Sequence, residues 1–192
     1  MMDSSFLITS FVTLFVVIDP LGLVPLFIAL TRGMAPDHRR AVGLRACVIA
    51  ALLLTLFGLF GQKLLDFVGI SMPAFRIAGG ILLFLTALDM LFERRTQRRE
   101  GQMPDADHDP SVFPLAMPLI AGPGALAAMI LLVGQSGPGL QGKALVLALM
   151  LVVIAVIYVL FLAAGPIERA LGRTGTSKEG YPEKIPACRA GE

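Results

Sequence analysis

Residues 16–27 read VVIDPLGLVPLF and place an aspartate, a glycine and two prolines inside an otherwise apolar run. Proline removes a backbone donor from a helix, glycine weakens it, and a carboxylate is costly inside a lipid bilayer. Aspartate followed by proline is nevertheless a typical helix start, because the Asp side chain accepts from free N–H groups and proline fits the first helical position. The stretch therefore predicts a helix that is broken at Asp19, with a new helix starting at Pro20.

The composition around this stretch indicates an integral membrane protein. Of the 192 residues 56% are hydrophobic and 16% are charged, and the mean hydropathy is +0.79. The apolar residues form continuous runs of about 20 residues, the length of helix that crosses a bilayer core of about 30 Å. Continuous rather than alternating runs favour helices over barrel strands. We predict an all-α fold, a polytopic transmembrane bundle with five spans, at residues 6–30, 41–60, 68–92, 112–133 and 144–164.

The basic residues predict how the bundle is oriented. Arginines and lysines are concentrated between the first and second runs, between the third and fourth, and after the fifth, whereas the alternate loops hold only Lys63 and Lys143. The cytoplasmic loops of membrane proteins are enriched in Lys and Arg. The sequence therefore predicts a periplasmic amino terminus and, with five spans, a cytoplasmic carboxyl terminus.

Several classes of chemistry find no support in the sequence. The net charge of +2 is too small to indicate a nucleic-acid partner. Cys47 and Cys188 lie far apart, so they predict neither a disulfide framework nor a metal site. No nucleophile with a positioned base and no phosphate-binding glycine loop appears in the sequence. We expect a protein that is not an enzyme and that holds no cofactor or metal.

The chain divides into two unequal halves around a charged segment. Residues 93–111, rich in charge and proline, predict a flexible cytoplasmic linker between a first three-helix repeat at 1–92 and a second repeat at 112–172. Near the start of each half a helix-breaking motif occurs, DPLG at residues 19–22 and GPG at residues 122–124. Three spans separate the motifs, so they face opposite ways across the membrane. This predicts an inverted repeat of the kind found in secondary transporters.

Three motifs in register carry a resemblance to a known family. The stretches IDPLGLVPLF, SMPAFRIAGGILLFLTALDM and FPLAMPLIAGPGA resemble the MarC family of bacterial and archaeal membrane proteins. The resemblance implies a six-span protein of the inner membrane, built as a 3+3 inverted repeat, with relatives that transport small neutral amino acids such as glycine and alanine.

The end of the chain departs from that pattern. The resemblance calls for a sixth span after the fifth, but residues 173–192 read RTGTSKEGYPEKIPACRAGE, which is polar and punctuated by proline. Such a segment cannot cross a bilayer and predicts a disordered cytoplasmic tail. We interpret it as a truncated or frameshifted carboxyl terminus, which leaves the second repeat with two helices and impairs the activity that the family implies.

The two breaks together predict the substrate. Asp19 offers a carboxylate suited to an ammonium group or a proton, whereas the uncapped N–H groups after Gly122 suit a carboxylate. A small zwitterionic amino acid, glycine, alanine or serine, fits both. The predicted substrate-binding residues are Asp19, Pro20, Gly22, Pro25, Gly122, Pro123 and Gly124, and Arg76, Gly79 and Gly80 are predicted as structural residues or charge partners. Arg76 is expected to pair with Asp19, since a lone charge in a membrane is costly.

Other interpretations of the same residues stay open. Proline and glycine are common in membrane helices, so each motif alone also fits a simple kink. A channel-like pore, or a membrane assembly or interaction protein without transport activity, competes with a transporter or exporter. The coupling ion, H⁺ or Na⁺, the direction of transport and a homo-oligomeric state are not determined by the sequence.

Overall fold

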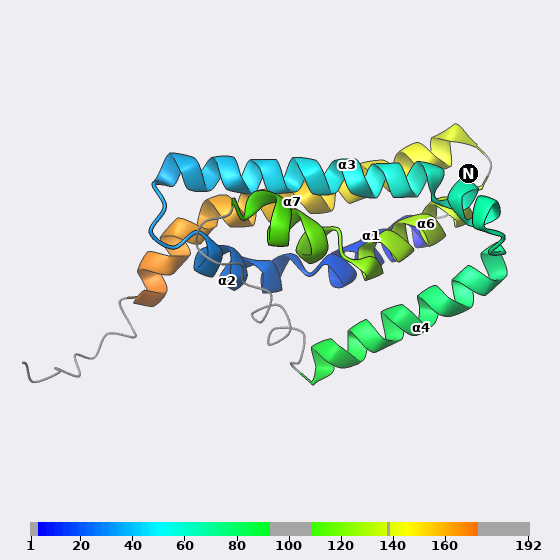
Figure 1. Cartoon of the computed structure of the whole chain (residues 1–192), viewed down its shortest axis with the longest axis horizontal. Helices are drawn as coiled ribbons and strands as arrows, with labels where there is room; N and C mark the ends of the chain where they lie inside the picture. The colour runs from blue at the N-terminus through cyan, green and yellow to red at the C-terminus, as the bar shows by residue number, and fades with distance from the viewer. Residues whose placement is uncertain (1–3, 93–108, 138, 173–192) are drawn as a thin grey trace, which may run out of the picture.

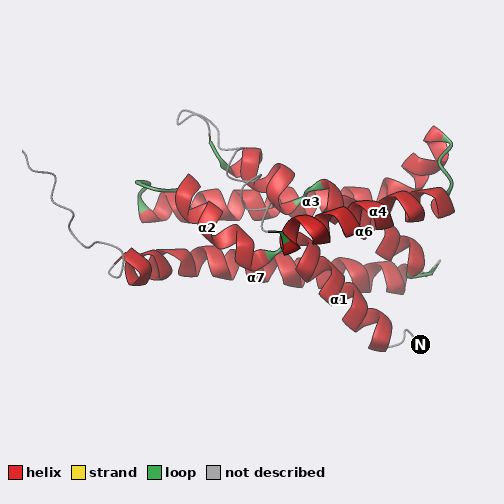
Figure 2. Cartoon of the chain, turned by 90° about the horizontal axis from the view of Figure 1, so that it is seen from below, coloured by secondary structure: helices red, strands yellow, loops and turns green. Residues whose placement is uncertain are grey.

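The computed structural model describes residues 4–92, 109–137 and 139–172, and in these ranges all regular structure is helical (Figures 1 and 2). The helices are, in chain order, α1 (Ser4–Ile18), α2 (Pro20–Leu30), α3 (Pro36–Val68), α4 (Met72–Leu91), η1 (Ser111–Ile120), α6 (Pro123–Gln135) and α7 (Leu140–Gly172). The predicted linker up to residue 108 and the predicted tail lie outside the described residues.

The predicted polytopic helix bundle is confirmed, with four to five candidate spans. Within the described residues four helical stretches are long and apolar enough to cross a membrane, and η1 with α6, bent by 55° at the break, is the fifth candidate. The first of the four contains α1 and α2 together, broken at Asp19 as predicted. α3 and α7 are longer than their apolar runs, at 33 residues each. Hydropathy marks only the part of a helix that suits lipid, so the polar ends of these helices were not foreseen.

The two broken spans run side by side in opposite directions. In Figure 1, α1 leads from the end near the amino terminus to the middle of the bundle and α2 continues to the far end, whereas α6 runs from the middle back toward the first end. Each broken span is followed by a long unbroken helix, α3 or α7. This arrangement is what an inverted repeat produces, with α1–α2 matching η1–α6 and α3 matching α7. α4 has no counterpart among the described residues.

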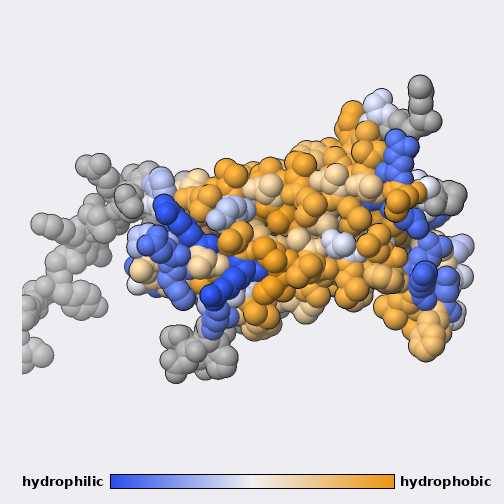
Figure 3. Space-filling model, turned by 90° about the horizontal axis from the view of Figure 1, so that it is seen from above, coloured by the Kyte–Doolittle hydropathy of each residue, from blue (hydrophilic) through white to orange (hydrophobic). Residues whose placement is uncertain are grey.

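The core lies where the broken spans pack between α3 and α7. Leu14, Ile18 and Phe27 from the first span meet Leu54 of α3 and Met150 of α7 in one buried cluster. On the face seen in Figure 3, a broad belt of apolar side chains lies between two hydrophilic ends. Such a belt would be costly in water but is solvated by lipid tails. The bundle is therefore that of an integral membrane protein.

The first part of the fourth span differs from the broken α-helix that the sequence predicts. η1 is a π-type segment in which Phe113 (φ −129°, ψ 126°) and Met117 (φ −134°, ψ 125°) have extended backbones. Each of them precedes a proline, Pro114 or Pro118, and the ring of a proline pushes the residue before it out of the helical region. Two such positions four residues apart prevent a regular helix from forming.

Candidate functional site

Asp19 caps the second half of the first span, as the sequence predicts. One of its carboxylate oxygens, Oδ1, accepts a hydrogen bond from the N–H of Gly22 at 3.0 Å, and Pro20 occupies the first turn. Its backbone has the left-handed values φ 60° and ψ 68°. The N–H of Asp19 still donates to the carbonyl of Phe15 at 2.9 Å, and the N–H of Leu23 donates to the carbonyl of Asp19 at 3.2 Å. The helical conformation is therefore broken at Asp19, although backbone hydrogen bonds continue across the break.

Gly22 is required by the position of this carboxylate. A Cβ atom at residue 22 would collide with the Oδ2 and Cγ atoms of Asp19. Any side chain there would drive the carboxylate off the helix start. Pro20 is buried beneath the break, whereas Pro25 is exposed on the outer side of α2, one turn further on. Of the four predicted residues of this motif, Pro25 thus lies apart from the carboxylate.

The second break has no side-chain cap. Gly122 precedes α6 in an extended conformation, Pro123 fills the first helical position, and the first hydrogen bond of α6 runs from the N–H of Leu126 to the carbonyl of Gly122 at 3.0 Å. The N–H groups of Gly124 and Ala125 come before that bond, at the positively polarised start of the helix. Both residues are buried. The uncapped helix start that the sequence predicts is therefore present inside the bundle.

Gly122 is needed because the backbone turns back on itself here. A Cβ atom at residue 122 would lie 2.6 Å from the carbonyl oxygen of Pro118 in η1. No real side chain tolerates that approach to a backbone atom, which cannot swing aside. Glycine at this position lets the irregular end of η1 fold against the start of α6.

The structure brings the two breaks together. A Cβ atom at Gly124 would lie 3.3 Å from Cγ1 of Val17, which is two residues before Asp19, and 3.6 Å from Oγ1 of Thr86 on α4. α1 and α6 therefore pack closely at the level of both breaks, and α4 closes the third side.

Thr86 and Val17 were missed as neighbours of the site. The Thr86 hydroxyl donates to the carbonyl of Leu82, in its own helix, at 2.9 Å. A lone threonine in the apolar run of α4 was the only signal for it, and such residues usually serve helix packing. Its contact with Gly124 depends on how α4 meets α6, which the sequence does not give.

The three predicted residues on α4 are placed differently from one another. Arg76 is exposed and forms no ion pair with Asp19 or any other described residue, so the expected pairing is not formed in this structure. Gly79 is buried against α6, where a Cβ atom would lie 3.1 Å from Cδ1 of Leu131. A Cβ atom at Gly80, by contrast, would meet no neighbouring atom within 4 Å. Only Gly79 permits a close helix contact.

The donor set around the breaks consists of one carboxylate, backbone N–H groups and a hydroxyl. Within the described residues, no group of three or more His, Cys, Asp or Glu side chains lies close enough together to hold a metal ion. These groups provide acceptor oxygens at one break and donor N–H groups at the other.

An all-α polytopic membrane protein with two opposed broken spans is the class that this fold and these breaks define. Over residues 4–178 the chain matches the MarC family of integral membrane proteins, and it belongs to that family. It is 42% identical over 175 residues to a UPF0056 membrane protein of Archaeoglobus fulgidus, covering 89% of this chain and 81% of the relative. It is 36% identical over 171 residues to the UPF0056 inner membrane protein YhgN of Escherichia coli K12, covering 89% of this chain and 84% of the relative. No solved structure matches the chain.

Proposed function

We propose that this protein is a secondary transporter of small zwitterionic amino acids such as glycine, alanine and serine. The observation that carries the proposal is the contact between Gly124 and Val17, which sets the uncapped start of α6 beside the break that holds Asp19. Opposed half-helices that meet inside a membrane bundle are the usual substrate site of inverted-repeat transporters. The substrate ammonium group binds at Asp19, and its carboxylate binds the N–H groups of Gly124 and Ala125.

The walls of the site favour a small side chain. Gly124 is in contact with Val17 and Thr86, and Ala125, Ala127 and Ala128 follow it on α6, all of them buried. A Cβ atom at Gly124 would already lie 3.3 Å from Cγ1 of Val17, so these walls do not accommodate a bulky substituent. Amino acids with no more than a methyl or hydroxymethyl side chain fit this space.

The name of one relative and the charge pattern support our proposal for the membrane and the orientation. The E. coli relative is named an inner membrane protein, and we assign this chain to the corresponding membrane. The end of the bundle at which α2 ends and α3 begins carries Arg32, Arg39 and Arg40, and it is assigned to the cytoplasm. The amino terminus, at the opposite end, is then periplasmic (Figure 1).

The test is uptake and counterflow of labelled alanine in vesicles that contain the purified 192-residue chain. We expect saturable uptake, and faster uptake when the vesicles are preloaded with unlabelled alanine. Gly124→Val crowds the start of α6 against Val17 and should abolish uptake, whereas Gly80→Val points into open space and should leave it unchanged. Asp19→Asn should lower uptake and change its pH dependence. Uptake like that of the parent protein in both Gly124→Val and Asp19→Asn would overturn the proposal.

A channel is the competing function, because broken helices also line pores. A channel would conduct without saturation and without counterflow. The same vesicles therefore separate the two functions: uptake that is linear in alanine concentration and insensitive to preloading would favour the channel.

A further inference from the structure

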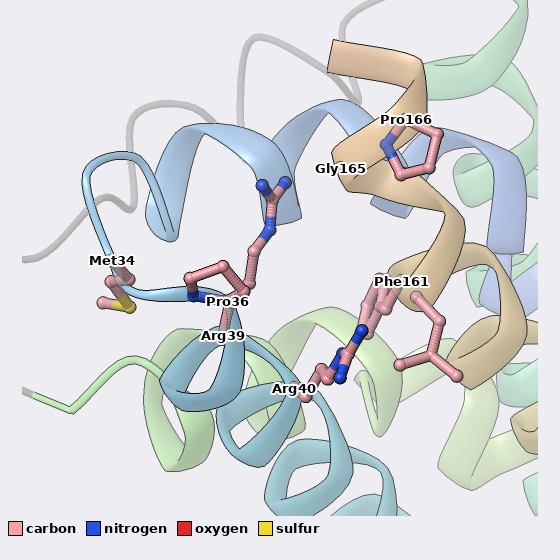
Figure 4. A pocket seen from close by; sticks show the side chains of 8 residues that line it. Met34, Pro36, Arg39, Arg40, Phe161, Gly165 and Pro166 are labelled. Carbon is pink, nitrogen blue, oxygen red and sulfur yellow. The ribbon is translucent and has the colours of Figure 1, made fainter. Parts of the chain in front are cut away.

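A pocket of about 430 Å³ opens at the basic end of the bundle, where α2 ends and α3 begins (Figure 4). Met34 and Pro36 line it in the connection to α3 and at the start of that helix. Of the residues that α7 contributes to the lining, Phe161 lies furthest from the end of the helix. The pocket has room for several water molecules, at about 30 Å³ each, so a small solute fits in it as well.

The inner side of this pocket is closed by two stacked rings. Phe161 lies against Phe27 of α2 with ring centroids 4.0 Å apart and planes at 7°. The two residues are 3% and 1% exposed. Gly43 of α3 faces both rings, since a Cβ atom there would lie 3.4 Å from an atom of each. Three helices therefore close tightly around the ring pair.

The ring pair stands between the pocket and the first break. Phe27 lies eight residues after Asp19, which is about 12 Å along a helix. Leu23, one turn before Phe27 on the same side of α2, is fully buried. α2 packs chiefly on α7, the helix that carries Phe161. A solute that moved along α2 between Asp19 and the pocket would therefore have to separate the two rings.

Both rings are carried by helix segments that a proline weakens. Pro25 precedes Phe27 by two residues, and Pro166 follows Phe161 by five. A proline offers no N–H to the carbonyl four residues before it, and helices bend at such positions. The rings can therefore separate without unfolding of either helix. This gives Pro25, which lies apart from the Asp19 carboxylate, a role in the motif.

We propose that the Phe27–Phe161 pair is a gate in the transport path and that the pocket is the vestibule on its basic-end side. The solute that passes is the small zwitterionic amino acid that binds at the two breaks, so the inference rests on the proposed function. With the rings stacked, as in this structure, the breaks are closed to the basic end. Separation of the rings joins the vestibule to Asp19, which is the step that alternating access requires at this end.

A cysteine at residue 23 tests the gate, because Leu23 lies one turn from Phe27 toward the break. The full chain carries Leu23→Cys together with Cys47→Ala and Cys188→Ser, so that residue 23 holds its single thiol. An impermeant methanethiosulfonate reagent is added to the side of the membrane at which a separate Arg32→Cys protein reacts.

We expect slow labelling of residue 23 when both rings are present, and labelling that is faster by about ten-fold or more when Phe161→Ala is added. Phe161→Leu removes the stacking but keeps most of the volume, so it should give an intermediate rate, and it decides the matter if the alanine variant does not fold. Leu54→Ala is the matched control, because it removes a fully buried side chain of α3 outside the ring pair. It should leave the labelling rate unchanged. The helical circular dichroism of each variant shows whether it is folded.

The gate is ruled out if the Phe161 variants label as slowly as the protein with both rings, or if Leu54→Ala accelerates labelling equally, which would indicate general loosening. Faster labelling from the side opposite to Arg32 would also overturn it. Its failure is separable from failure of the proposed function. Labelling that depends on Phe161, without saturable alanine uptake, would keep the gate and overturn the assigned substrate. Saturable uptake with labelling that is independent of Phe161 would keep the transporter and overturn the gate.

Discussion

At the residue scale, Asp19 combines two roles that are separable by substitution. Its carboxylate caps α2 through the Gly22 N–H, and its backbone is left-handed, a conformation that costs most residues about 1–2 kcal/mol. Asn and Asp tolerate this conformation better than other residues that carry a side chain. The break thus needs a short side chain with an oxygen at residue 19. The negative charge of Asp19 is not needed for capping.

We expect Asp19→Asn to keep the fold and Asp19→Ala to destabilise it. Asparagine retains a capping oxygen and tolerates the left-handed backbone, whereas alanine loses the cap, which costs about 1 kcal/mol, and suits the backbone poorly. Asp19→Gly should fall between them, because it relieves the backbone and loses the cap. Thermal unfolding midpoints in detergent measure the order. An alanine variant as stable as the asparagine variant would show that the cap is unimportant.

At the scale of elements, glycines set how closely α6 approaches its neighbours. Gly61 of α3 is buried, and a Cβ atom there would collide with Cγ1 of Ile130 on α6. Gly79 of α4 is in milder contact with Leu131 on the same helix. Since α6 carries one of the two breaks, these contacts fix the position of the candidate site.

Gly61→Ala should therefore destabilise the bundle by about 1–3 kcal/mol, the usual cost of overpacking. Gly80→Ala is the matched control, because its Cβ meets no neighbour and alanine favours a helix over glycine by about 1 kcal/mol. Adding Ile130→Ala to Gly61→Ala should recover part of the loss. Unfolding midpoints of the four proteins test this, and equal midpoints for the two glycine variants would contradict the contact.

Asp109 connects the start of η1 to α3, outside the spans. Its Oδ1 accepts from the N–H of Ser111 at 3.0 Å, and its Oδ2 accepts from Nη1 of Arg45 at 3.2 Å. The hydrogen bonds from Ser111, and after them the charge of Arg45, lower the pKa of the Asp109 carboxyl. A lowered pKa in the folded state stabilises the fold above the ordinary pKa of Asp, and this contribution is lost as the pH falls through the folded value.

Asp109→Asn should therefore make the protein less stable at neutral pH by at most about 1 kcal/mol, since both side chains of the ion pair are exposed. The gap between variant and parent should close on acidification. Unfolding midpoints measured at neutral pH and at a pH below the ordinary Asp value test the sign. A gap that widens in acid would show that the carboxylate does not stabilise the fold.

At the scale of the whole molecule, charge is segregated between the two ends of an apolar bundle. Arg32, Arg39 and Arg40 lie where α2 meets α3, and Lys63 lies near the opposite end of α3. The orientation proposed above depends on this asymmetry.

Cysteine labelling tests this orientation. With Cys188→Ser as background, Lys63→Cys should react with an impermeant thiol reagent added to intact cells, and Arg32→Cys should react only after the cells are opened. The native Cys47 is buried and stays unlabelled. The reverse pattern would invert the assigned orientation.

The sequence by itself determined the properties that are local. Apolar runs of span length specify membrane helices, and Asp19–Pro20 and Gly122–Pro123 specify helix starts, because caps and prolines act on the adjacent turn. These predictions needed no knowledge of neighbours in space. The helix ends beyond the apolar runs were missed, because hydropathy marks lipid-exposed length and not helix length.

Only the tertiary structure decided how these parts meet. The contact of Gly124 with Val17 and Thr86 joins three helices that lie far apart in sequence. The exposed position of Arg76 follows from the side of α4 that packs on α6. The pocket that is lined by Arg39 and Arg40 of α3 and by Phe161 of α7 likewise depends on the approach of these two helices (Figure 4). In a membrane, lipid tails solvate apolar side chains as well as protein does. Hydrophobicity alone therefore cannot select which helices make contact. The close fit of small residues between helices selects these contacts.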